Sequence, residues 1–227
     1  MPPRALWVPF PLGRPFGTAN DRDFQLDVLR SLLSLFNETT GPVLADYGRD
    51  APDQLDDDVA WTCALPLPPL DEATTKREQL TQALQSEAGF LLPWFEEGLS
   101  KRGRTMFGVS GLDTEDIAEM AAFVAAFAAG ETPEPIDGAN PNPMAALRPI
   151  VDDLKTFYQE AAAEQPGAAR PNPYAMNRWF YYETRMGEAL YEIRDALTAR
   201  SEALPSENRP PPVNLIPNMF RERPAKS

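Results

Sequence analysis

The chain offers few side chains for catalysis, and its single cysteine, Cys63, stands first among them. The sequence contains no histidine, which excludes Ser-His-Asp and Cys-His mechanisms and every histidine-containing zinc or iron site. One thiol also excludes an intramolecular disulfide and a cysteine-ligated metal cluster within one chain. Any chemistry must therefore come from carboxylates, Arg or Lys, Tyr, hydroxyl groups, the thiol or a bound cofactor.

Cys63 has two interpretations. A thiolate is the best nucleophile that a chain without histidine can offer. Cysteine is also among the most buried residue types, and the apolar neighbours Trp61, Ala64 and Leu65 favour a place in the core. The sequence favours core packing over reactivity, but it offers no stronger candidate nucleophile than Cys63.

Two further places suit ligand binding. Arg14 lies between Gly13 and Pro15, where a guanidinium on a fixed backbone fits a substrate carboxylate, although a salt bridge is the commoner role. Ser110 and Gly111 lie in a turn before a predicted helix, where backbone N–H groups and the helix dipole favour an anion. A purely structural turn is favoured there, because the glycine-rich phosphate pattern and its lysine are missing.

Strands and helices alternate in the elements that would position these residues. Stretches rich in β-branched and aromatic residues predict strands over residues 6–10, 61–65 and 105–109. Apolar residues at helical spacing predict helices over residues 22–37, 71–87, 90–99, 113–130, 144–165 and 172–201. Asn20 or Asp21 is expected to cap the first helix. The fold class is therefore α/β or α+β, with a small, mostly parallel sheet, flanking helices and a C-terminal helical hairpin.

One hydrophobic core suffices for 227 residues. We expect an α/β core over residues 1–130, a linker rich in Pro, Asn and Gly over 131–143, and a helical half over 144–203 packed on that core. A proline-rich tail over 204–227 follows, in which residues 213–216 are the one candidate edge strand.

The charge balance restricts the partners. The chain has 34 acidic and 21 basic residues, a formal net charge of -13, which repels nucleic-acid phosphates and anionic lipids. No stretch approaches the roughly 20 apolar residues of a membrane-spanning helix, and the N-terminal apolar stretch is too short for a signal peptide. We therefore expect a cytoplasmic protein that binds neither nucleic acid nor membrane.

Several motifs resemble one known family. They are residues 8–17 (VPFPLGRPFG), 61–65 (WTCAL), 102–105 (RGRT), 108–113 (GVSGLD), 152–155 (DDLK) and 179–180 (WF). This set is similar to the short selenoprotein B-like proteins of the glycine/betaine/sarcosine/D-proline reductase family. The resemblance implies reductive cleavage of a C–N bond, which in that family depends on a selenocysteine and a nearby cysteine. This chain has no selenocysteine, and Cys63 is its only cysteine.

Three hypotheses for function follow. The first is a reductase-like enzyme or enzyme component acting on a small amino-acid-like or thiol-containing substrate, with Cys63 as nucleophile and Arg14 as carboxylate anchor. This hypothesis requires Cys63 to lie beside the loop over residues 11–17. The second is a non-catalytic protein-binding or assembly protein. The third is a flavin- or quinone-dependent redox protein, although nothing in the sequence identifies a cofactor.

Two properties of the whole molecule are also predicted. Aromatic residues on two faces of the helix over 172–201, including Phe180 and Tyr191, favour a homodimer interface, with packing under the proline-rich tail as the alternative. Without histidine, we expect stability to be nearly flat between pH 6 and 8.

Overall fold

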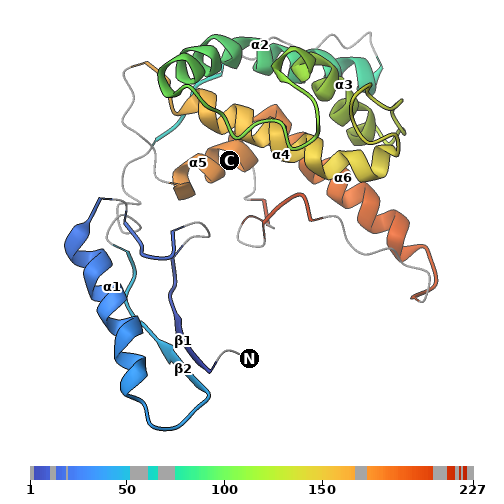
Figure 1. Ribbon diagram of the computed structural model, residues 1–227. Coiled ribbons are helices and arrows are strands. Elements are labelled where there is room, and N and C mark those ends of the chain that lie inside the picture. Colours follow the sequence, from blue (N-terminus) through green and yellow to red (C-terminus); the bar gives the residue numbers. More distant parts are fainter. Residues whose placement is uncertain are drawn as a thin grey trace. The chain divides into compact units, whose positions relative to one another are not determined.

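The computed structural model describes residues 3–10, 14–18, 20–51, 61–65, 75–166, 173–206, 214–217, 220, 222 and 223. The chain divides into two compact units, Met1–Ala60 and Trp61–Ser227. We call them the N-terminal unit, which contains both strands, and the helical unit, whose described elements are helices (Figure 1). The protein thus combines a two-stranded parallel sheet with helices.

The N-terminal unit has the order β1 (Arg4–Trp7), α1 (Arg22–Ser34), η1 (Leu35–Asn37) and β2 (Val43–Asp46). The two strands pair in parallel, with Leu6 opposite Ala45. A small core forms on one side of the sheet around Phe24 and Val28 of α1. The predicted helix over residues 22–37 is confirmed, and Asp21 caps it by accepting a hydrogen bond from the Phe24 backbone N–H at 3.0 Å.

The helical unit holds the larger core. Its elements are α2 (Lys76–Arg102), η3 (Thr114–Asp116), α3 (Ile117–Ala128), α4 (Pro143–Ala162), α5 (Pro173–Glu183) and α6 (Arg185–Glu202). Helix α2 packs along α3 and α4, and α3 also contacts α6 (Figure 1). The predicted helices over 113–130 and 144–165 are confirmed, and residues 131–143 connect α3 to α4 within this unit.

Two predicted strands are wrong. Residues 61–65 and 105–109 form neither strand nor helix. The backbone N–H groups of Gly108 and Val109 donate to a carboxylate of α4 instead of to a neighbouring strand, which removes the donors that a sheet would need. In the predicted edge strand, Val213 lies outside the described residues, and residues 214–216 are not in a strand.

The helix boundaries in two places also differ from the prediction. Of the helices predicted over 71–87 and 90–99, residues 71–74 lie outside the described residues, and the rest form one helix, α2. It continues through Pro93, on either side of which Leu91 and Phe95 are fully buried in the core. The helix predicted over 172–201 is broken into α5 and α6. Thr184 ends the first and caps the second, because its hydroxyl accepts from the Gly187 N–H at 2.8 Å.

None of the described helices combines the length and the apolar content that crossing a bilayer requires.

Candidate functional site

Cys63 lies in a segment, residues 61–65, that is neither helix nor strand and that docks on helix α5. Its backbone carbonyl accepts a hydrogen bond from the Trp179 indole at 2.9 Å, and the Thr62 hydroxyl donates to Glu183 at 2.7 Å. Trp61 packs edge-on against Trp179, with ring centroids 5.7 Å apart. The residues whose composition predicted a strand therefore pack on a helix instead of pairing with another strand.

The environment of the Cys63 side chain disfavours the thiolate. The residue is 3% exposed within the core of the helical unit. Burial, together with the nearby Glu183 carboxylate, raises the pKa of Cys63 to about 12. Because the thiolate is the nucleophile, a thiol with this pKa is inert at neutral pH.

Arg14 lies in the other unit. It belongs to a turn closed by a hydrogen bond from the Gly17 N–H to the Arg14 carbonyl at 2.9 Å, and Gly17 takes a φ of 78°. The residues just before it, 11–13, lie outside the described residues. Since Arg14 and Cys63 belong to different units, their convergence on one pocket stays a prediction.

The turn at Ser110 binds an anion, and the anion is the chain's own Asp153. The Asp153 carboxylate accepts from the backbone N–H groups of Gly108, Val109 and Ser110 at 2.8–2.9 Å and from the Ser110 hydroxyl at 2.6 Å. Asp153 is fully buried, so these four donors compensate its desolvation. They are thereby occupied, and a substrate would have to displace Asp153 to use them.

Gly111 has a structural reason to be glycine. Its φ is 89°, a left-handed conformation that side chains rarely adopt. A Cβ atom there would lie 2.9 Å from the carbonyl oxygen of Gly138. The residue thus permits close approach of two loops, and no contact of Gly111 points to a ligand.

Glu87 is the second buried carboxylate of the helical unit, and it joins three helices. From α2 it accepts hydrogen bonds from the backbone N–H groups of Arg185 at 2.6 Å and Met186 at 3.1 Å, which form the first turn of α6. It also accepts from the Tyr158 hydroxyl of α4 at 3.0 Å. A carboxylate at a helix N-terminus satisfies donors that have no partner within the helix.

Burial dominates the electrostatics of this carboxylate. Desolvation raises the pKa of Glu87 to about 7, although its three hydrogen bonds and the charge of Arg185 oppose the rise. Burial and the adjacent Glu87 in turn raise the pKa of Tyr158 well above its ordinary value. Perturbed pKa values mark functional candidates, but Glu87 is occupied by three protein donors within the core.

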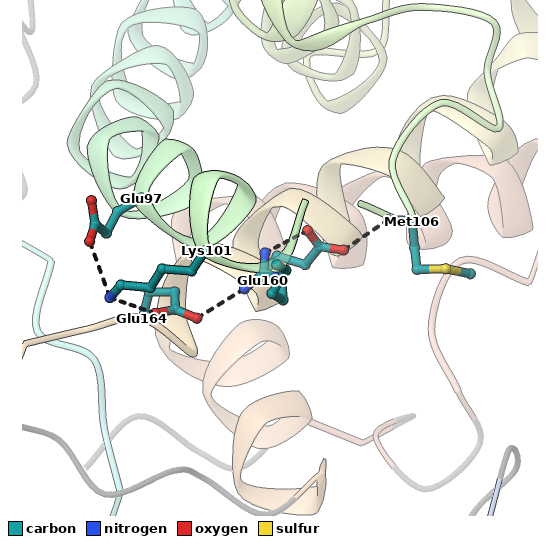
Figure 2. Close-up of polar contacts among 6 residues, drawn as sticks. Glu97, Lys101, Met106, Glu160 and Glu164 are labelled. Carbon is teal, nitrogen blue, oxygen red and sulfur yellow. Dashed lines mark hydrogen bonds and ion pairs between the residues drawn. The ribbon is translucent and has the colours of Figure 1, made fainter. Parts of the chain in front are cut away.

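A third group of carboxylates forms ion pairs with basic residues and links the C-terminal ends of α2 and α4 (Figure 2). Arg102 pairs with Glu160 at 2.9 Å and with Glu164 at 3.0 Å, and Lys101 pairs with Glu97 and Glu164. Glu160 also accepts from the backbone N–H of Met106 at 2.9 Å. These contacts join the C-terminal end of α2 to that of α4 and to the segment that follows α2.

An open groove of about 550 Å³ lies along α2 beside α3, and its lining residues are Arg77, Glu78, Thr81, Gln82, Gln85, Ser86 and Ala122. Neither Cys63 nor Ser110 lines it. Within the described part of the chain, no group of three or more Cys, Asp or Glu side chains could hold a metal ion.

The aromatic surface that favoured a dimer is part of the core. Phe180 is fully buried and Tyr191 is 4% exposed. The tail residue Phe220 stacks on Tyr181 at 5.3 Å, and its carbonyl accepts from the Tyr191 hydroxyl. Phe180 packs against Tyr158 of α4, with ring centroids 5.5 Å apart, so neither Phe180 nor Tyr191 is exposed. The predicted interface at these two residues is therefore wrong.

Sequence reasoning missed Glu87 and Asp153, although both leave a signal. Each is an acidic residue at the edge of a helical apolar stripe: Glu87 comes one turn before Leu91, and Asp153 one turn before Phe157. Charged residues are almost never fully buried unless paired. An acidic residue at such a position therefore indicates a buried carboxylate with dedicated donors.

The most exposed apolar surface of the N-terminal unit lies on two separate sides. On the outer face of the sheet, Trp7 is 53% and Leu44 is 63% exposed. On the outer face of α1 and η1, four residues form a second apolar stripe: Leu29, Leu32, Leu33 and Phe36. Contiguous exposed apolar patches mark interaction surfaces when they exceed a few hundred Å².

Comparison with known proteins identifies no relative: no family model, curated protein or solved structure matches the chain.

Proposed function

We propose that the protein is a non-catalytic binding protein that docks another protein through its N-terminal unit. The main support is the exposed apolar surface on the outer face of the parallel sheet. Parallel sheets are normally covered by helices on both faces, whereas here α1 covers one face and Trp7 and Leu44 remain exposed on the other. An amphipathic helix of a partner would complete the layer, giving the small parallel sheet with flanking helices that the sequence predicts.

The register of the strands supports a continuous docking face. Ala5 lies opposite Leu44 and Trp7 opposite Asp46, so these four side chains share one face because residues alternate along a strand. Trp7 and Leu44 supply the apolar area, and Asp46 lies at one end. Tryptophan is enriched among residues that dominate binding energy, which makes Trp7 the expected centre of the interface.

The surroundings of the candidate catalytic groups also support a binding role. The Cys63 thiol is buried with a raised pKa, and the Ser110 turn is occupied by Asp153. A reductase-like function would require Cys63 to become accessible. That hypothesis, with its small-molecule substrate and unidentified cofactor, stays a prediction.

Site-specific photo-crosslinking in cells tests the proposal. A photoreactive residue at position 7 or 44 is expected to give one covalent adduct of defined mass, and mass spectrometry then identifies the attached protein. The purified pair should bind, and Trp7→Asp should weaken that binding at least about tenfold, because a buried charge replaces an apolar contact.

Met106 provides the matched control, because it is an exposed apolar side chain, 72% accessible, on the helical unit. A probe at position 106 should not give the same adduct, and Met106→Asp should leave binding unchanged. Equal crosslinking from all three positions, or none from positions 7 and 44, would contradict the proposed function.

A further inference from the structure

Helix α1 carries two apolar faces. Phe24 and Val28, with Leu35 of η1, form the first and are buried. The second comprises Leu29, Leu32 and Leu33 of α1 and Phe36 of η1, which are 36%, 37%, 50% and 75% exposed. Their spacing of i, i+3, i+4 and i+7 places them on one side of the helix, and its centre lies roughly 110° around the axis from the buried face.

Charged residues lie off this second stripe. Between residues 29 and 36 the only charged residue is Arg30, which helical geometry places roughly 110° from the centre of the stripe. Asp27 faces another direction, where it accepts hydrogen bonds from Tyr47 and Arg49, each at 2.7 Å. The stripe is therefore an uninterrupted apolar strip about 10 Å long, given 1.5 Å of rise per residue.

We infer that this stripe is a homodimer interface, in which the α1 helices of two copies pack antiparallel about a two-fold axis passing between Leu32 and Leu33. The inference rests on the proposed binding role of the N-terminal unit and names the occupant of its second apolar surface. It also moves the predicted dimer away from Phe180 and Tyr191.

Self-complementarity singles out a second copy as the occupant. Two-fold symmetry between positions 32 and 33 sets Leu29 against Phe36 of the other copy, and Leu32 against its Leu33. Each exposed apolar side chain then meets an apolar side chain, and the self-complementary patch is what a two-fold interface requires. Interdigitated apolar rows are also the usual packing of antiparallel helices.

The available area fits a weak dimer. The exposed parts of the four side chains amount to roughly 400 Å² per copy. For comparison, one fully buried aromatic side chain removes about 150–250 Å² from water. Two copies with their polar rims therefore reach about 1,000 Å², the lower limit of a specific interface. We expect a dissociation constant on the order of micromolar.

Sedimentation equilibrium of the full chain over about 1–200 µM tests the inference. The mass should rise from 25.2 kDa towards twice that value. Leu33→Asp and Phe36→Asp should each weaken the dimer more than tenfold with unchanged circular dichroism, because both positions are exposed. Leu44→Asp, an equally exposed change on the sheet, is the matched control and should leave the dimer intact.

Disulfide crosslinking tests the orientation. Since the native Cys63 is buried, engineered cysteines on α1 report on the interface alone. A mixture of the Leu29→Cys and Phe36→Cys variants should crosslink to each other, whereas each variant by itself should not. Crosslinking of each variant with itself would instead indicate parallel helices and would overturn the arrangement.

A monomer at 200 µM without crosslinks would overturn the inference. That result would leave the proposed function standing if Trp7-dependent binding of a partner persists. Conversely, a dimer that survives both stripe substitutions would show that the chain self-associates elsewhere, and the assignment to α1 would be wrong.

Discussion

The burial of Glu87 makes the stability of the protein depend on pH. Its pKa of about 7 in the folded state lies above its ordinary value of 4.5. The folded state therefore holds the proton more tightly, and this contribution to stability is complete at acid pH and is lost as the pH rises through 7. The sequence-based expectation of flat stability between pH 6 and 8 considered histidine and missed a buried carboxyl group.

We predict that the free energy of unfolding falls by about 1.4 kcal/mol between pH 6 and pH 8. Urea unfolding at pH 6, 7 and 8 measures it. Glu87→Gln should be destabilised but should show no slope. Glu78→Gln, on the same helix, should retain the wild-type slope, because hydrogen bonds to Thr75 lower the pKa of Glu78. An unchanged slope in Glu87→Gln would assign the titration to another group.

The reactivity of Cys63 separates the binding hypothesis from the catalytic one. With its pKa raised to about 12 and its side chain buried, we expect iodoacetamide at pH 8 to modify the native protein at least about 100-fold more slowly than glutathione. Denaturant should restore the ordinary rate. A native thiol that reacts faster than glutathione would revive Cys63 as a nucleophile and count against the proposed function.

Asp153 of α4 anchors a whole loop. Its carboxylate accepts hydrogen bonds from residues 108–110, which precede α3, and so fixes this loop against α4. Its neighbour Asp152 makes an ion pair with Arg148 at 2.8 Å, and its side chain is 42% exposed. We predict that Asp153→Asn costs about 2–4 kcal/mol, because an amide N–H would face buried N–H donors. Asp152→Asn should cost less than about 1 kcal/mol, and chemical denaturation compares the two. Equal costs would mean that the loop does not depend on Asp153.

The corner between α5 and α6 depends on a glycine. A Cβ on Gly187 would lie 2.3 Å from the carbonyl oxygen of Phe180 and 2.6 Å from that of Tyr181. Gly187→Ala should therefore destabilise the protein by about 2 kcal/mol or more. Gly89 of α2 has open space around it, so Gly89→Ala should stabilise by up to about 1 kcal/mol. Thermal unfolding distinguishes the two, and equal shifts would contradict the tight corner.

At the scale of elements, the sequence located helices better than strands. Apolar spacing identified α1, α3 and α4 because a buried helical face repeats regularly. The segments at 61–65 and 105–109 show β-propensity, which reports a half-buried extended chain rather than a partner strand. Their actual partners, Trp179 and Asp153, are distant in sequence, and local patterns carry no information about such pairs.

The sequence also predicted the candidate site only in part. The sequence favoured a structural turn at Ser110 over a site for an external anion, and the turn holds the chain's own Asp153 carboxylate. The burial of Cys63 followed from its apolar neighbours. The two apolar faces of α1 could not be told apart in sequence, because the Phe24 face and the Leu33 face have similar composition and only packing decides which one is buried.

At the scale of the whole molecule, charge opposes association. Each chain carries a formal charge of -13, so two copies repel each other over the Debye length, which is about 30 Å at 0.01 M salt and about 8 Å at 0.15 M. The apolar contacts inferred for the α1 stripe are not screened by salt. Net repulsion and local apolar attraction therefore respond oppositely to ionic strength.

We predict that the dimer tightens several-fold when salt rises from 10 mM to 150 mM, because screening removes repulsion and leaves the apolar contact intact. Sedimentation equilibrium at both salt concentrations measures the change. Phe36→Asp should stay monomeric at both, which controls for general salting-out. A dimer that weakens with salt would instead be held by ion pairs, and the apolar stripe of Leu29, Leu32, Leu33 and Phe36 would not be its interface.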